Sequence, residues 1–478
     1  MRRVGFIRFF GIVVLFLLIA LTPSLALAQS QATAATLEGY VFDPTGAVVP
    51  EVTVTAVNAG TGLTRTVKTN AVGYYIIPLL PPGTYTVTFT KPGFAELKLE
   101  GIELRVGDAL TVNGTLQPAG VREEVLVTAE TLPLIETTRT QPGTVIDRTL
   151  IDVLPLNGRN WTELVLLTPG VTAADDFGNV SFTGVDRVFN NIQVDGADNN
   201  NAYFGEIRGR TRAPFQFSQE TVQEFRVANS NFSAEFGRAA GGIVNAITRS
   251  GTNEWRGTAF YYIRDDAWNA NGFFNNANNV PKPPERRQQF GGNIGGPLIR
   301  NKLFWFLNYD HQIRNEPVTV TLGARLESEI RALRGPDREL AERFFRPLVR
   351  AIPRDFDQIN FFPRLDWQIT PHHTLTLTHN FQQFDSRNGV FTTPTTTTNI
   401  TGNAKNFTNS YTSVIALNSV LTPTLLNEFR FNFVFDDTGD FANDPTLPQI
   451  TVAGFNLGGR TFLHARPGDF PGRFTKER

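Results

Sequence analysis

The chain has 478 residues, a formal net charge of −1 and no cysteine. The near-neutral charge gives no electrostatic reason to expect nucleic acid as a partner, and the missing cysteines exclude stabilisation by disulfides. The 40 phenylalanines, abundant glycine and only 19% charged residues are typical of a β protein with an apolar surface.

The N-terminus predicts export from the cytoplasm. Three arginines precede an apolar run over residues 9–21, and a small-residue site follows at Ala26 and Ala28. This order indicates a secretory signal peptide over residues 1–28, with cleavage after Ala28. A membrane anchor is the alternative, but the apolar run is short and Pro23 interrupts it.

Residues 29–118 predict a small antiparallel β-sandwich, because short strand patterns alternate with turns such as DPTG at 43–46. The sequence GYYIIPLLPPGTY at 73–85 resembles the carboxypeptidase-regulatory-like domain, which implies a transthyretin-like fold related to carbohydrate-binding domains. Tyr74, Tyr75 and Tyr85 either stack on a sugar ring or pack in the core, and the core is the favoured interpretation.

The next segment, EEVLVTA at 123–129, is an acidic pair followed by an extended β-branched run. It resembles the TonB box of TonB-dependent outer-membrane receptors, and an ordinary edge strand is the alternative. The resemblance implies that the segment is added as a strand to a periplasmic partner. The expected box residues are Glu123, Glu124, Val125, Leu126, Val127, Thr128 and Ala129.

Residues 119–256 carry four further motifs in order. They are LPLNGRN at 154–160 before a short helix over 161–167, NIQVDG at 191–196, VQEF at 222–225 and EFGRAAGGIVNAITRSGTNEWRG at 235–257. This order resembles the plug domain of the Oar-like branch of the same receptors, which implies a mixed α/β plug. The motif residues are Val194, Asp195, Gly196, Gly237, Arg238, Gly241, Gly242 and Asn245.

In the last of these motifs, a glycine pair permits close backbone approach, residues 243–248 read as a strand, and residues 250–253 read as a turn. Asp195 with Asp198 could act as a base or metal ligand, but a turn between two strands is the favoured interpretation. Arg208, Arg210 and Arg212 are expected in a solvated loop rather than at an anionic substrate, and residues 199–201 in a polar loop.

The chain offers no pattern for catalysis or metal binding. No histidine occurs before His311, and neither a Ser-His-Asp, a Cys-His nor a zinc-ligand pattern can be assembled. His373 and His379 are too far apart on a strand to share a metal, and His372 faces the other side. We therefore expect no enzyme, no catalytic residue, no metal and no cofactor.

From residue 257 to 478, apolar residues recur at every second position, as in long β-strands. Phe429, Phe431, Phe433 and Phe435 share one face of the run at 425–436, opposite charged and polar residues, as in an outer-membrane barrel strand. Long polar segments and a helical insertion near 326–352 predict long loops on one side and short turns on the other. The FGGNIGGPL and NKLFWF segments, at 290–298 and 301–306, resemble the first barrel hairpins of Oar-like receptors.

Together these features predict an all-β chain of signal peptide, transthyretin-like sandwich, plug and the first part of a transmembrane antiparallel barrel. About eight to ten barrel strands fit after residue 256, fewer than a closed receptor barrel has. We therefore expect the N-terminal part of a longer, truncated receptor.

The resemblance implies energised uptake across the outer membrane, with the sandwich in the periplasm. The implied partners are the TonB–ExbB–ExbD complex, outer-membrane lipid and an unknown ligand; saccharide, peptide and metal chelate all stay open. An adhesion or carbohydrate-binding protein anchored by the barrel is the alternative, and it would not need the box. A secreted hydrolase is disfavoured because no catalytic pattern is present.

Overall fold

The computed structural model describes residues 33–120, 124–128, 143–156, 158–174, 179–201, 205, 207–208, 215–232, 236–271, 276, 281–282, 284–389, 395–422, 425–443 and 450–457. The expected signal peptide, with Ala26 and Ala28, lies outside the described residues, as do Glu123 and Ala129. No helix in the described part of the chain is long and apolar enough to cross a membrane.

Two β-sheets form the predicted sandwich. One has the order β4-β1-β7, with β8 also paired to β1, and the other has the order β3-β2-β5-β6-β9. The strands are β1 (Ala35–Phe42), β2 (Thr53–Asn58), β3 (Thr64–Lys68), β4 (Tyr74–Leu80), β5 (Gly83–Thr90), β6 (Glu96–Leu104), β7 (Ala109–Thr111), β8 (Gly114–Thr115) and β9 (Glu124–Thr128). Burial alternates along β4 of one sheet and along β5 of the other, so each sheet turns one face to a shared apolar core.

Two of the three tyrosines considered for sugar stacking belong to this core. Tyr75 and Tyr85 are 1% and 0% exposed, and their hydroxyls donate to the carbonyls of Val112 and Pro81 at 2.6 and 2.7 Å. Buried phenols need such acceptors. The core interpretation is confirmed for both, whereas Tyr74 is half-buried and donates to a Glu38 carboxylate oxygen at 2.6 Å.

The plug is built on a mixed five-stranded sheet of order β10-β15-β16-β13-β14. Its elements are β10 (Thr144–Ile146), α2 (Arg148–Val153), η2 (Trp161–Leu167), β11 (Val171–Ala173), β12 (Val180–Phe182), η3 (Arg187–Phe189), β13 (Asn191–Val194), β14 (Ala197–Asp198), η4 (Gln219–Thr221), β15 (Val222–Ala228) and β16 (Ile243–Thr248). The predicted strand at 243–248 is β16, which is buried along its whole length between antiparallel β15 and parallel β13.

The predicted helix at 161–167 is present as a 3-10 helix. The Asn160 side chain caps it by accepting from the Thr162 N–H at 3.2 Å. It ends at Thr168, which has an extended backbone as residues before proline prefer, and Pro169 follows. Trp161 anchors the helix in the plug core against Phe225, with ring centroids 5.2 Å apart.

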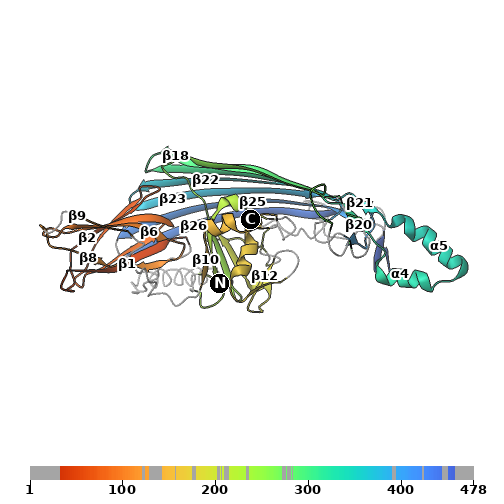
Figure 1. Ribbon diagram of the computed structural model, residues 1–478, viewed down its shortest axis with the longest axis horizontal. Helices are drawn as coiled ribbons and strands as arrows, with labels where there is room; N and C mark the ends of the chain where they lie inside the picture. Colours follow the sequence, from red (N-terminus) through yellow and green to blue (C-terminus); the bar gives the residue numbers. More distant parts are fainter. Residues whose placement is uncertain are drawn as a thin grey trace, which may run out of the picture. The chain divides into compact units, whose positions relative to one another are not determined.

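Seven antiparallel strands form one sheet, which we call the wall. In order they are β17 (Arg256–Asp265), β18 (Arg286–Ile299), β19 (Leu303–Asn315), β22 (Asp355–Thr370), β23 (His373–Ser386), β25 (Ala404–Thr422) and β26 (Leu425–Ala442). In Figure 1 the long wall strands run side by side.

The turns of the wall have the predicted asymmetry. Residues 300–302 and 371–372 make short turns at one end, whereas residues 266–285, 316–354 and 387–403 connect strands at the other. Among the described residues the sheet contains seven strands, where eight to ten were expected, and most of these strands exceed the ten residues assumed, β25 reaching 19. The described wall is an open sheet, as expected from a partial barrel.

The predicted two faces of β26 are confirmed. Phe429, Phe431 and Phe433 are 54%, 51% and 44% exposed, whereas Arg430 and Asn432 are half-buried on the other face. Those two side chains approach the plug, since Asn432 donates to the Asp198 carbonyl at 3.1 Å. Exposed phenylalanine outside and polar groups inside are the arrangement of a strand between lipid and a barrel lumen.

The expected helical insertion is a small subdomain beyond the ends of the wall strands. Its elements are β20 (Val318–Val320), α4 (Gly323–Ala332), α5 (Gly335–Phe345), η5 (Arg346–Leu348), β21 (Ala351–Ile352), β24 (Thr395–Thr396), β27 (Ile450–Val452) and β28 (Phe455–Leu457). Figure 1 shows α4 and α5 next to β20 and β21. Leu326, Ile330 and Phe455 belong to its own apolar core.

Candidate functional site: the plug and its anchors on the wall

The Val-Asp-Gly motif is a hairpin turn, as predicted. Asp195 and Gly196 form the two-residue loop between β13 and β14, with φ angles of 50° and 70°. Two successive positive φ angles fit the type I′ turn, which favours Asp-Gly. The Asp195 carboxylate accepts from the backbone N–H and the hydroxyl of Thr248 at 2.9 and 2.7 Å. It therefore joins this turn to the end of β16.

Arg364 on β22 connects this turn to the wall. Its guanidinium donates to the Thr248 carbonyl at 2.9 Å and the Thr248 hydroxyl at 2.7 Å, and lies 3.4 Å from an Asp195 oxygen. Two further bonds of 2.7 and 2.9 Å go to Asp366. All these groups are largely buried, so separating the plug from the wall here would leave unpaired charges unless water replaced the partners.

A second anchor joins the plug to β26. Arg208 donates to an Asp436 oxygen at 2.8 Å, with side chains 7% and 3% exposed, and Ser410 donates to the other oxygen at 2.6 Å. The expectation that Arg208 belongs to a solvated loop is wrong, because the wall supplies a buried carboxylate for it. Arg210 and Arg212 lie outside the described residues.

The expected polar loop at 199–201 is buried too, since its three asparagines are 1–2% exposed. Asn199 donates to Gln216 at 2.6 Å and Asn200 to Asn191 at 3.1 Å. The residues are polar, as predicted, but they pair with other plug residues rather than with solvent.

Amide side chains of the wall hold one plug segment, residues 215–218. Gln358 and Gln382 donate to the Phe215 carbonyl at 2.7 and 3.0 Å, and Asn380 donates to the Gln216 carbonyl at 3.1 Å. These wall residues come from β22 and β23. Neutral amide bonds of this kind exchange readily for bonds to water, because each contributes only about 1 kcal/mol net.

A buried carboxylate, Glu220 in η4, gathers three arginines of the plug. Its oxygens lie 3.1 Å from Arg148, 2.5 Å from Arg159 and 3.5 Å from Arg249, and Asn293 of β18 donates to it at 2.9 Å. The sequence motifs do not include Glu220. The partners stand far apart in the sequence, so only the folded chain reveals this cluster.

The plug glycines confirm the expected close approach. A Cβ at Gly241 would lie 2.3 Å from the Asn190 side chain, and one at Gly242 would lie 2.3 Å from the Phe182 ring. At Gly237 nothing lies within 4 Å of that position. Arg238 pairs with Asp198 at 2.8 Å on the surface. Val194 and Asn245 are buried in β13 and β16.

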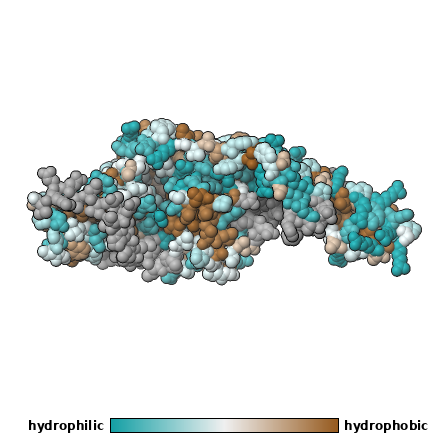
Figure 2. Space-filling view, in the orientation of Figure 1, coloured by the Kyte–Doolittle hydropathy of each residue, from teal (hydrophilic) through white to brown (hydrophobic). Residues whose placement is uncertain are grey.

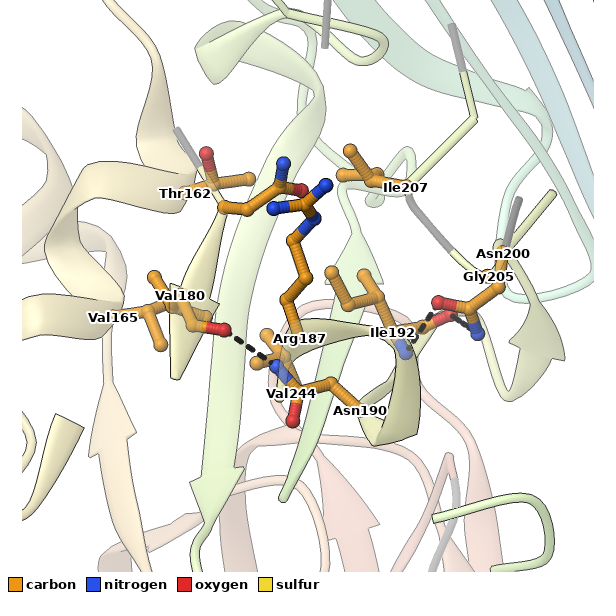
Figure 3. A pocket seen from close by; sticks show the side chains of 11 residues that line it. Thr162, Val165, Val180, Arg187, Asn190, Ile192, Asn200, Gly205, Ile207 and Val244 are labelled. Carbon is orange, nitrogen blue, oxygen red and sulfur yellow. Dashed lines mark hydrogen bonds between the residues drawn. The ribbon is translucent and has the colours of Figure 1, made fainter. Parts of the chain in front are cut away.

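Two small cavities lie in the described plug or at its contact with the wall. One of about 20 Å³ lies among Val165, Val180, Ile192, Val244 and Arg187, whose side chain extends between Thr162 and Ile207 in Figure 3. Another of about 10 Å³ lies between plug and wall, beside Phe217 and Phe362. Such volumes have room for about one water molecule each. Neither has room for an organic ligand.

Part of the plug surface is apolar and uncovered. Figure 2 shows an apolar area over the plug near the middle of the face in view. Val153, Leu167 and Phe189 of the plug are 67%, 54% and 52% exposed. The seven described wall strands therefore do not cover every side of the plug.

The candidate box is a strand. Residues Glu124–Thr128 form β9, which pairs in parallel with β6 at the end of the sheet order. Both interpretations from the sequence agree with an extended edge strand, and the TonB box stays a prediction.

Two histidines of the cluster at 372–379 contact serines on the neighbouring strand. His373 and His379 each lie beside a serine of β25, with Nδ1 2.9 Å from Ser419 Oγ and 2.8 Å from Ser413 Oγ. Among the described residues, no group of three or more histidine, aspartate or glutamate side chains is placed to hold a metal ion.

Comparisons with known proteins match this architecture. Residues 36–117 match the carboxypeptidase regulatory-like domain, and residues 247–327 match an outer membrane beta barrel domain. The chain is 31% identical over 328 residues to the TonB-dependent transporter Oar of Myxococcus xanthus. That match covers 64% of this chain and 29% of the relative, so the chain matches less than a third of the relative's length.

Solved structures also resemble the chain, with low sequence identities and TM-scores below 0.5. The outer membrane transporter YddB from Escherichia coli is 13% identical, covering 65% of this chain and 42% of that chain, with a TM-score of 0.45. A mutant of the ferric enterobactin receptor of Pseudomonas aeruginosa is 15% identical, covering 66% and 43%, with a TM-score of 0.42.

The Oar relative is a transporter, not an enzyme, and the matched barrel domain belongs to the outer membrane. The predicted absence of enzymatic activity agrees with that relative. The two matched domains and the Oar relative show that the chain resembles the Oar-like TonB-dependent outer-membrane receptors and carries a carboxypeptidase regulatory-like domain before its plug.

Proposed function

We propose that this protein takes up a ligand across the outer membrane with energy from the TonB–ExbB–ExbD complex. The observation that carries the proposal is the extended edge strand Glu124–Thr128, placed in the chain directly before the first plug strand β10. An edge strand offers backbone groups to a partner strand, and tension on it passes along residues 129–143 to the plug.

The anchors described above suit such a mechanism. The plug contacts the wall through polar side chains, among them Arg364 with Thr248 and Arg208 with Asp436. Water can replace amide and hydroxyl partners one at a time as the plug is displaced. An apolar interface would instead expose its whole surface at once. The ligand itself stays open among saccharide, peptide and metal chelate.

We place the functional parts at the boundaries expected from the sequence: residues 1–28 as signal peptide, 29–118 as sandwich in the periplasm, 119–256 as box and plug, and 257–478 as barrel strands. The TonB box is proposed at 123–129, and the plug motif residues are proposed to shape the contact with the wall.

The test uses the absence of cysteine from the chain. Ala246→Cys places a small thiol in β16 at a fully buried position, where a maleimide reaches it only when the plug loosens. In energised cells, replacing residues 123–129 with a Gly-Ser segment of equal length should lower labelling of this thiol to the rate seen without a proton gradient. Val48→Cys, exposed on the sandwich, is the matched control and should label equally throughout.

If the Gly-Ser replacement leaves labelling of the Ala246→Cys protein unchanged, energised uptake through this segment is refuted. The adhesion alternative predicts that outcome. One observation favours a carbohydrate role for the sandwich: Tyr40 is 41% exposed, and its ring lies 5.2 Å from that of Tyr74. Paired rings of this kind can stack on a sugar. Loss of polysaccharide binding in Tyr40→Ala, with binding kept in the Gly-Ser variant, would support that second candidate.

A further inference from the structure

The edge of the sandwich sheet is occupied by the chain's own box segment. β9 lies parallel to β6 over five residue pairs, from Glu96 opposite Glu124 to Glu100 opposite Thr128. This register sets Val125 and Val127 opposite Leu97 and Leu99, which belong to the sandwich core. On its other side β6 pairs with β5, so β9 completes the sheet as its fifth strand.

This placement limits how the segment meets another strand. Each residue of a strand directs its N–H and C=O to one side, so about half of the backbone groups of β9 are bound to β6. A partner that needs the full strand must take it from β6. Moreover, while β9 is bonded to β6, tension on β9 is shared with the sandwich instead of passing wholly to the plug.

The chain connection and the short pairing of β9 also permit its release from β6. Only residues 121–123 separate β9 from the last described sandwich residue, Gly120, so the sandwich stays attached upstream when β9 leaves. A parallel pair of five residues is short and slightly less stable per residue than an antiparallel pair. Such a pair can hold the segment without preventing its exchange.

We propose that the edge of β6 is a binding site for residues Glu124–Thr128, and that the sandwich holds the box there until the TonB strand takes it. This inference rests on the proposed function, because it assigns that partner to the segment. While the box is bound to β6, the backbone groups on that side are unavailable, and for a partner that uses them the apparent affinity falls in proportion to the released fraction.

A disulfide tests the proposal. Lys98 and Leu126 are direct partners on β6 and β9, and such partners lie about 5 Å apart, within disulfide range. Within one molecule of the full chain carrying Lys98→Cys and Leu126→Cys, the two thiols can pair only with each other, since the protein has no other cysteine, and the monomeric oxidised form is the one assayed. The measurement is binding of the purified periplasmic domain of TonB, before and after reduction.

We expect the oxidised protein to bind this domain at least about tenfold more weakly than the reduced protein. The matched control is Thr55→Cys with Thr66→Cys, a partner pair on β2 and β3 of the same sheet, which should bind equally in both states. Equal binding by oxidised and reduced forms of the Lys98–Leu126 pair would overturn the proposal, since it would show that the partner needs no release from β6.

Hydrogen exchange of the unmodified chain provides a second, independent measurement. Amides of residues 124–128 that bond to β6 should be protected in the free protein. Exchange as fast as in an unstructured peptide would refute the site on β6. If neither the unmodified nor the reduced protein binds the TonB domain, the proposed function fails, and hydrogen exchange alone then decides whether β6 holds the segment.

Discussion

The sandwich core and the plug–wall contact are both buried, but different chemistry holds them. The sandwich core consists of apolar side chains such as Leu37, Tyr75 and Phe89, each at most 1% exposed. The plug–wall contact adds guanidinium, carboxylate and amide groups, such as the Arg208–Asp436 pair, to an apolar contact in which Phe306 and Phe362 of the wall join the plug core. Water cannot replace the contacts of apolar side chains when they separate, whereas it can replace the hydrogen-bond partners of polar side chains. The sandwich core therefore has no polar route to opening, whereas the polar part of the plug–wall contact can exchange its partners for water.

The largest effect is expected in the sandwich core. Phe89→Ala removes a fully buried ring that packs against Tyr75 at 5.7 Å, and should lower the free energy of unfolding of the sandwich by about 3–5 kcal/mol. Hydrogen exchange of β2, β5 and β6 measures it. Thr66→Ala, at an exposed position of β3, is the control and should change little. Slow exchange retained in the Phe89→Ala protein would mean that the apolar core does not set sandwich stability.

A smaller effect is expected at the plug anchor, because water can enter there. Arg364→Met leaves Asp195 and Asp366 without their cation and should destabilise the closed plug by on the order of 3 kcal/mol. Faster exchange of the Thr248 amide is the measurement. Arg325→Met removes an exposed arginine paired with Glu329 on α4, and should have almost no effect. An equal response to both changes would show that the buried anchor contributes no more than a surface ion pair.

The smallest effect is expected where the sandwich contacts the plug, at Val106 and Glu224. The Val106 N–H donates to Glu224 at 2.5 Å, and burial, with a further contribution from Asp108, raises the pKa of Glu224 to about 7 from an ordinary 4.5. The folded protein therefore binds this proton more tightly than the unfolded chain. The stabilisation is complete below about pH 4.5 and is lost as the pH rises through about 7.

Glu224→Gln keeps an oxygen acceptor for Val106 but cannot ionise. We expect it to remove this part of the pH dependence and to stabilise the protein by on the order of 2 kcal/mol at pH 8 relative to the unmodified chain. Unfolding by denaturant at pH 4 and pH 8 measures the difference. The same pH dependence in both proteins would show that Glu224 does not titrate in this window.

Much of the architecture follows from sequence patterns of short range. Alternation along 425–436 predicted the two faces of β26, the Asp195-Gly196 pair predicted a hairpin turn, and strand patterns with turns such as that at 43–46 predicted a sandwich. The described wall strands are longer than assumed from the sequence, because strand length depends on how far neighbouring strands continue to pair. The helical insertion was located, but not the small sheet and core that hold it.

Strand patterns, turns and the need for small residues at the plug glycines can be read from the sequence, because neighbouring residues fix side-chain period and backbone conformation. Which charges meet depends on the tertiary fold. Arg208 with Asp436, the arginines around Glu220, and β9 on the edge of β6 each join residues remote in the chain. Such pairs leave no local period in the sequence, since their energy arises only when folding excludes water between them.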